Sequence, residues 1–223
     1  MATSTTYLWT EISSVPQKPG VYAWYYLPEI TDFDLQQTID RIKTYRDHGD
    51  EETALKSIED FLETFVFRYF QEEPYQAILR GSLKPRYEGA IEHKPELSEK
   101  LIERIVEEPE RLITIKQVLE KSAPEFASPI YIGMSENLSS RLRRHKRLIE
   151  KYSEQLLSRT SLQRTDAKEA ENRDESFAMR ICSRNIPPTR LFVSINILEN
   201  VGKRYVDIEN ILNRIHYPLL GRN

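Results

Sequence analysis

The segment from residue 136 to 152 concentrates side chains that can bind a phosphate group. Within it, Arg141 and His145 are four residues apart, so on a helix they share one face. The guanidinium of an arginine is permanently charged and can donate two parallel hydrogen bonds to phosphate oxygens. Positive charge is spread around this pair by Arg143, Arg144, Lys146 and Arg147. The pattern predicts a phosphate-binding helix, but it is equally typical of a surface helix whose basic side chains are only solvated.

Two tyrosines and a glutamate add further residue types suited to phosphodiester hydrolysis. Tyr22 ends the tripeptide GVY, Tyr131 begins the tripeptide YIG, and Glu209 lies near the C-terminus. A phenol can orient or deprotonate a water molecule, and a carboxylate is a hard oxygen ligand for a divalent cation. Each residue also has a structural explanation, because strand tyrosines usually pack in the core and helix glutamates usually face solvent. His145 alone is more typical of a hydrogen-bonded residue at the edge of the core.

Taken in order, these residues resemble the GIY-YIG nuclease family. The resemblance rests on GVY at 20–22 after Pro19, YIG at 131–133, Arg141 and His145 at the family's spacing from Gly133, and Glu209 in a terminal helix. It covers residues 19–27, 128–152 and 191–223, which is under half of the chain. It implies an endonuclease that hydrolyses the phosphodiester backbone of nucleic acid with one divalent cation, and we expect the substrate to be DNA.

The resemblance also implies a role for each site residue. Tyr22, in preference to Tyr131, would act as general base or orient the attacking water. A tyrosine with an ordinary pKa of about 10 is a poor base at neutral pH, so its neighbours would have to favour the ionised form. Arg141 would stabilise charge on the phosphate, with His145 beside it, and Glu209 would bind Mg²⁺ or Mn²⁺. The other basic residues of this segment, Arg143, Arg144, Lys146 and Arg147, would bind the nucleic-acid backbone.

One position departs from the family pattern. The family commonly places an asparagine shortly after the proline that follows the glutamate helix, and Gly221 stands there in this chain. Asn213 in the helix or Asn223 at the end of the chain are the two candidate replacements. If neither serves, the ordering of the site and its turnover are in doubt.

Three segments read as strands that would position these residues. They are residues 19–27, 128–135 and 191–198, each rich in aromatic and β-branched residues and bounded by proline, serine or glycine. Helices are expected at 136–152 and 204–216 from their apolar spacing. The fold class we expect is therefore α/β, with a small GIY-YIG-type core formed by residues 1–27 and 129–223. Its mainly antiparallel sheet would have three strands flanked by helices.

Residues 28–128 differ in character and read as a large helical insertion. Apolar residues recur at spacings of three and four over 32–70, with a break near His48-Gly49-Asp50, and again over 94–121. Each of these stretches predicts two helices. Residues 153–174 are polar with few apolar anchors, so we expect a mobile or partner-ordered loop there.

Composition limits the remaining classes of function. A net charge of −3 does not suit a nonspecific nucleic-acid coat, so any such site must be a local basic patch. The single cysteine, Cys182, allows neither an intramolecular disulfide nor a cysteine metal cluster, and it fits the cytoplasm. No stretch approaches the roughly 20 apolar residues that a membrane helix needs, and no secretory leader is recognisable.

Two other functions stay open at this point. The chain could be a catalytically weak or inactive nucleic-acid-binding module of nuclease ancestry, which would show no response to metal. It could instead be a protein-interaction module centred on the insertion, whose acidic residues Glu107, Glu108 and Glu110 suit a basic partner. The structure and sequence of the nucleic acid, the biological role (restriction, repair or mobile element) and the oligomeric state are likewise open.

Overall fold

The computed structural model describes residues 4–68, 75–81, 84–91, 97–158, 173–198 and 205–220. The chain divides into two compact units, unit 1 with residues 1–28 and 118–223, and unit 2 with residues 29–117. The division falls inside the last helix of the expected insertion and not at residue 128. Among the described residues, no helix is long and apolar enough to cross a membrane.

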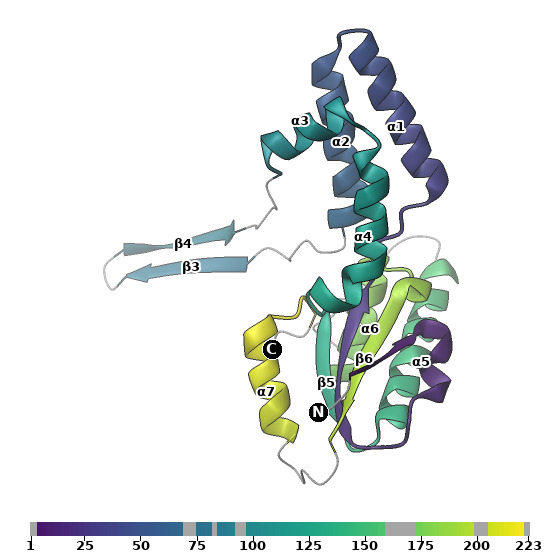
Figure 1. Cartoon of the computed structure of the whole chain (residues 1–223). Helices are drawn as coiled ribbons and strands as arrows, with labels where there is room; N and C mark the ends of the chain where they lie inside the picture. Colours follow the sequence, from purple (N-terminus) through teal and green to yellow (C-terminus); the bar gives the residue numbers. More distant parts are fainter. Residues whose placement is uncertain are drawn as a thin grey trace. The chain divides into compact units, whose positions relative to one another are not determined.

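Unit 1 contains a four-stranded sheet with helices packed around it (Figure 1). In chain order its elements are β1 (Thr5–Leu8), the 3₁₀ helix η1 (Trp9–Ser14), β2 (Gly20–Tyr26), β5 (Tyr131–Ser135), α5 (Leu138–Ser158), α6 (Arg173–Ser183), the 3₁₀ turn η4 (Pro188–Arg190), β6 (Leu191–Ile197) and α7 (Tyr205–His216). The strand order is β1-β6-β2-β5, and each neighbouring pair is antiparallel. The fold is thus of mixed helix and sheet, as expected.

The expectation of three strands is wrong by one. The additional strand, β1, pairs with β6 at the edge of the sheet, with Tyr7 opposite Val193. The strand has only four residues, TTYL, and alternation over four residues is too weak a signal to predict a strand. Its stability comes from the ladder with β6, which no local pattern reveals.

The interior strand β2 places three of its aromatic residues on one face of the sheet. Because side chains alternate along a strand, Tyr22, Trp24 and Tyr26 share that face, and none is more than 1% exposed. In the register with β5, Tyr22 lies opposite Gly133 and Trp24 lies opposite Tyr131. Tyr22 and Tyr131 are therefore diagonal neighbours on the same face.

Two glycines permit this packing. A Cβ atom on Gly133 would lie 2.5 Å from the Tyr22 hydroxyl oxygen, so only a glycine lets that ring lie across β5. A Cβ atom on Gly20 would lie 2.3 Å from the carbonyl oxygen of Asn196 in β6. The glycines of the GVY and YIG tripeptides thus have a packing reason, independent of any catalysis.

Helices α5 and α6 pack against each other and cover the face that carries Tyr22 and Trp24 (Figure 1). The buried stripe of α5 is formed by Leu138, Leu142 and Ile149, all fully buried. Helix α6 begins inside the segment 153–174 for which we expected a loop, and α5 extends to Ser158, so that expectation is wrong at both ends. Residues 159–172 lie outside the described part. Helix α7 packs beside β5 and β2.

Unit 2 contains helices and, contrary to expectation, a β-hairpin. Its elements are α1 (Asp32–Asp47), α2 (Glu51–Leu62), a π-helical turn η2 (Glu63–Phe67), β3 (Tyr75–Gly81), β4 (Lys84–Ile91) and α3 (Glu99–Glu107), followed by α4 (Arg111–Phe126), which continues into unit 1. The two helix pairs and the break near residue 49 are confirmed, since Gly49 has a φ of +74° between α1 and α2. The hairpin pairs Leu79 with Tyr87.

Candidate functional site

Four of the five predicted site residues meet on the buried face of the sheet. Tyr22 comes from β2 and Tyr131 from β5, and their ring centroids are 6.2 Å apart. Arg141 and His145 come from α5. The Nε of Arg141 donates to the Tyr22 hydroxyl at 3.3 Å, and the His145 ring centroid lies 5.6 Å from that of Tyr22 and 5.7 Å from that of Tyr131.

A residue that the sequence did not single out, Asp174, holds this cluster together. It is 1% exposed at the start of α6. Its Oδ1 accepts from Nη2 of Arg141 at 2.6 Å and lies 2.9 Å from Nε2 of His145, while its Oδ2 lies 3.3 Å from Nε of Arg144. A usable signal did exist, because Asp174, Phe177 and Ile181 follow a helical spacing that would have placed the aspartate on a buried face.

The hydrogen bonds of His145 fix which of its ring nitrogens carries the proton. The indole Nε1 of Trp24 can only donate, and it lies 3.2 Å from Nδ1 of His145. Nδ1 must therefore accept and be unprotonated, so Nε2 carries the hydrogen and donates it to Asp174. The Tyr22 hydroxyl, at 3.4 Å from the same Nε2, makes the longer contact.

The electrostatics of His145 agree with this neutral form. Burial lowers the pKa of His145 by more than the hydrogen bond and charge of Asp174 raise it. With Nδ1 facing Trp24 and Nε2 facing Asp174, both nitrogens are engaged. The geometry favours a positioning role for His145, and its predicted catalytic role stays a prediction.

Both tyrosines are held in the neutral form. Burial raises the pKa of Tyr22 well above the ordinary value of 10.0, and the neighbouring Tyr131 adds to this, while Arg141 opposes it. Burial likewise raises the pKa of Tyr131, with Arg141 lowering it and the negative charges of Glu209 and Asp174 raising it. A tyrosine here needs additional positive charge before it can act as a base.

Arg141 keeps its charge in this setting. Burial alone lowers its pKa, but the contacts with Tyr22, Asp174 and Tyr131 outweigh burial and raise it. The two contacts described use its Nε–H and one Nη2 hydrogen, and a guanidinium has five N–H donors. Its side chain is 29% exposed, so the remaining donors have a route to a ligand.

The fifth predicted residue, Glu209, belongs to α7 and is half-buried. It lies close enough to Tyr131 for its negative charge to raise the pKa of that phenol. One turn later, the side-chain nitrogen of Asn213 donates to the backbone carbonyl of Glu209 at 2.9 Å, which places Asn213 next to the predicted metal ligand. The other asparagine candidate, Asn223, and Gly221 fall outside the described residues.

The donor set around Glu209 is compatible with one hard divalent cation. No group of three or more histidine, cysteine, aspartate or glutamate side chains that could hold a metal occurs within the described ranges. Mg²⁺ commonly binds through one or two carboxylates and keeps several waters, which leaves positions for water and phosphate oxygens. A single half-buried carboxylate fits a loosely held Mg²⁺ or Mn²⁺ in this way.

The four basic residues predicted to bind nucleic acid do not act alike. Arg144 lies with Asp174 in the cluster, whereas Arg143 and Lys146 donate to backbone carbonyls of η1, those of Ser13 at 2.6 Å and Trp9 at 3.1 Å. The side chain of Arg147 has no hydrogen bond or ion pair with any residue whose position the structure describes. Binding of nucleic acid by this set stays a prediction.

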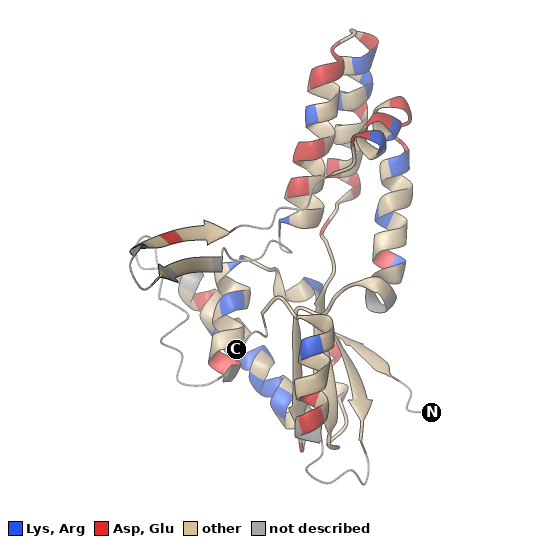
Figure 2. Cartoon of the chain, turned by 90° about the vertical axis from the view of Figure 1, so that its left-hand side faces the viewer, with Lys and Arg blue, Asp and Glu red and all other residues tan. Residues whose placement is uncertain are grey.

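Charge is unequally divided between the two units. Unit 1 contains 19 basic and 14 acidic residues, a net charge of +5, whereas unit 2 contains 13 basic and 21 acidic residues, a net charge of −8. Figure 2 shows the acidic residues distributed over the helices of unit 2. The overall charge of −3 is therefore the sum of an acidic unit 2 and a basic unit 1, and unit 1 contains the candidate site.

Comparison with known proteins adds no relative. No model of a known protein family matches the chain. No curated protein and no solved structure matches it either. The likeness to the GIY-YIG family thus rests on the sequence motifs alone.

Proposed function

We propose that the chain is a metal-dependent endonuclease of the GIY-YIG type that hydrolyses the phosphodiester backbone of nucleic acid, with DNA as the expected substrate. The observation that carries the proposal is the meeting of Tyr22, Tyr131, Arg141 and His145 from three separate elements, with Glu209 close enough for its charge to raise the pKa of Tyr131. More than a hundred residues separate the two tyrosines in the chain, and their position on one face of the sheet supports the interpretation of the two tripeptides as parts of one site.

Each residue of the cluster has a chemical task. Arg141 would direct its remaining N–H donors at the nonbridging oxygens, where negative charge grows in the transition state. The hydroxyl of Tyr22 accepts from Arg141, which leaves its own hydrogen free to point at a water molecule or at a phosphate oxygen. Asp174 and His145 would hold Arg141 and Tyr22 in position.

Glu209 would hold the divalent cation. When bound there, the cation supplies positive charge for the phosphate and lowers the pKa of a water molecule. This added positive charge would favour the ionised form of a tyrosine whose pKa is raised, and only the ionised form can act as a base. The task of the protein is then to orient the phosphate and the tyrosines around that charge.

The charge of unit 1 supports nucleic acid as the ligand. A net charge of +5 on the unit with the site attracts a polyanion, while the −8 of unit 2 repels it. Binding should therefore be confined to unit 1. The acidic unit suits a basic protein partner, which keeps the interaction role of the insertion as a separate proposal.

A second candidate function is nucleic-acid binding without cleavage. It is favoured by the pairing of Arg141 with a buried carboxylate and by the raised pKa of Tyr22. Both features reduce the reactivity of the cluster without reducing the positive charge of unit 1. The two functions make the same prediction for binding and opposite predictions for metal dependence.

The deciding experiment is incubation of the purified protein with plasmid DNA, branched DNA and RNA in the presence of Mg²⁺, Mn²⁺ or EDTA. Metal-dependent cleavage that disappears in Glu209→Gln supports the nuclease. Saturable binding without cleavage under all metal conditions supports the second candidate. A protein that neither binds nor cleaves any of the three would overturn both.

A further inference from the structure

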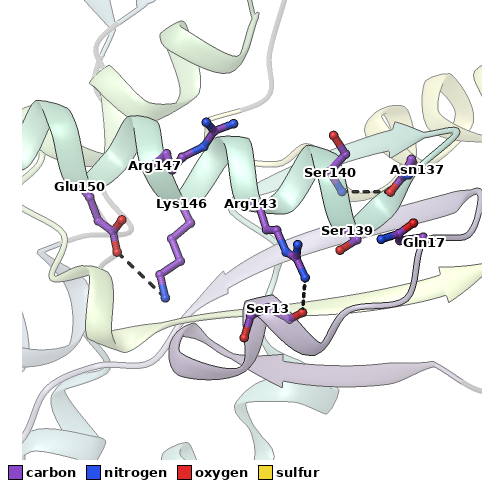
Figure 3. A pocket seen from close by; sticks show the side chains of 9 residues that line it. All are labelled: Ser13, Gln17, Asn137, Ser139, Ser140, Arg143, Lys146, Arg147 and Glu150. Atoms are coloured by element: carbon purple, nitrogen blue, oxygen red, sulfur yellow. Dashed lines mark hydrogen bonds and ion pairs between the residues drawn. The ribbon is translucent and has the colours of Figure 1, made fainter.

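A cavity of about 500 Å³ lies between η1 and α5 (Figure 3). Three of the side chains that line it, Arg143, Lys146 and Arg147, are cationic, and of the lining residues only Glu150 is anionic. The carboxylate of Glu150 lies 4.0 Å from Nζ of Lys146 at one end of the cavity. The lining thus carries a positive formal charge.

This cavity is on the opposite side of α5 from the candidate active site. With 3.6 residues per turn, Ser139, Arg143 and Glu150 project from one side of the helix. Arg141 and His145 project from the other side, toward Asp174. A helix is roughly 10 Å across with its side chains, so one phosphate group cannot contact both places.

The three cationic side chains of the cavity can only donate hydrogen bonds. Two acceptors that face it are already used, because the Ser13 carbonyl accepts from Arg143 at 2.6 Å and Oδ1 of Asn137 accepts from the backbone N–H of Ser140 at 3.0 Å. The guanidinium of Arg147 is exposed and makes no contact of this kind with the described part of the chain. A cavity with surplus donors and positive charge suits an anion.

Ser139 gives an independent indication of a ligand. The residue is 2% exposed, and its Oγ has no hydrogen-bond partner among the residues that the structure describes. Figure 3 shows this hydroxyl on the cavity side of α5. A buried hydroxyl without a partner is unfavourable, and a ligand oxygen in the cavity would satisfy it.

We propose that this cavity binds a phosphate group, held by the charge of Arg147 and Lys146 and by a hydrogen bond from Ser139. The phosphate group could belong to a nucleic-acid backbone or to a free phosphate or nucleotide. The inference extends the proposed function, because a nucleic acid bound here would contact α5 on both sides. Only the identity of the molecule that carries the phosphate depends on that function.

Binding measurements without cleavage test the site. Inorganic phosphate is titrated by calorimetry and a short labelled DNA duplex by fluorescence anisotropy, both in EDTA and over a series of salt concentrations. The variants are Arg147→Gln and Ser139→Ala. The matched control is Lys151→Gln, which removes an exposed cation of α5 that does not line the cavity.

We expect Arg147→Gln and Ser139→Ala to weaken phosphate binding roughly threefold or more, and Lys151→Gln to leave it within about twofold. If the backbone is the natural source, Arg147→Gln also weakens duplex binding and lowers its salt slope by about one. Weakened phosphate binding with unchanged duplex binding assigns the site to a free phosphate or nucleotide.

Three results would overturn the proposal. They are the absence of saturable phosphate binding, equal effects of Arg147→Gln and Lys151→Gln, and an unchanged affinity in Ser139→Ala. The last two would mean a general basic field around α5. Because the assay contains no metal, a failure of the nuclease proposal alters none of these results.

Discussion

Replacing Asp174 with asparagine perturbs the one carboxylate at the centre of the cluster. Oδ1 now faces Arg141 at 2.6 Å and His145 at 2.9 Å, and Oδ2 faces Arg144 at 3.3 Å. An asparagine keeps the size of the side chain and one accepting oxygen. Its NH₂ group, however, is a donor and would face the N–H donor that the second carboxylate oxygen of Asp174 now accepts from. The substitution also leaves two guanidinium groups without a counter-charge.

The expected cost follows from the burial of these groups. Breaking a buried ion pair costs about 3–5 kcal/mol when the remaining charge has no other partner. Here the side chains of Arg141 and Arg144 are 29% and 48% exposed, so water relieves part of the loss. We therefore expect Asp174→Asn to lower the free energy of unfolding by about 2–3 kcal/mol, between the value for a charged hydrogen bond and that for a fully buried pair.

The pH dependence of this loss is also fixed by the site. Burial by itself would raise the pKa of Asp174, but the hydrogen bond from His145 and the charges of Arg141 and Arg144 outweigh it and lower the pKa. A lowered pKa stabilises the fold above the unfolded-state value of about 3.9 and loses that effect as the pH falls through the folded-state value. The gap between wild type and variant should be constant above about pH 5 and shrink below about pH 4.

Urea unfolding followed at several pH values measures both quantities. The control is Glu154→Gln, an exposed carboxylate of α5, which should change the free energy of unfolding by no more than about 0.5 kcal/mol. A loss below about 1 kcal/mol in Asp174→Asn, or a gap that does not shrink in acid, would refute the view that an ionised Asp174 organises the cluster.

Three further substitutions test the remaining parts of the site. Glu209→Gln should abolish metal-dependent cleavage and leave nucleic-acid affinity largely unchanged, as read from cleavage and anisotropy assays; retained activity would remove Glu209 from the metal site. Arg141→Lys should slow single-turnover cleavage by about 2–4 kcal/mol in barrier terms at saturating enzyme, and a native rate would make Arg141 a docking residue only. Gly133→Ala should displace the Tyr22 ring and cost about 1–3 kcal/mol of stability, because the new Cβ atom would lie 2.5 Å from the Tyr22 hydroxyl oxygen. Gly89→Ala is the control and should have no such cost, because no atom lies within 4 Å of its new Cβ atom. Equal unfolding midpoints for the two variants would contradict this prediction.

The sequence predicted those parts of the fold whose signals are local and long. The segments 19–27 and 191–198 contain five and four aromatic or β-branched residues, respectively, and they became β2 and β6. Strand β1 was missed because it has only four residues. The strands of the hairpin, β3 and β4, were missed because polar residues and glycine interrupt their apolar residues. Such strands gain their stability from pairing, which depends on residues far away in the chain.

The same distinction applies to the candidate site. Arg141 and His145 were recognisable because they are four residues apart on one helix. Asp174 lies 29 residues after His145 and is preceded by a polar stretch, so only the packing of α6 on α5 brings it into the cluster. The neutral state of His145 was equally hidden, since it depends on the packing of α5 against β2, which brings Nδ1 of His145 within 3.2 Å of Nε1 of Trp24.

The presence of a carboxylate inside a proposed phosphate site has an electrostatic reason. Arg141 and Arg144 contribute two positive charges, His145 is neutral, and Asp174 removes one, so the cluster retains a single positive charge. A phosphodiester linkage carries one negative charge, and this cluster matches it. Without Asp174, two guanidinium groups would attract phosphate more strongly but would lack the partner that orients Arg141. Asp174→Asn should therefore raise affinity for phosphate and lower the cleavage rate at saturation, whereas a residue that only supports the fold would change both in the same direction.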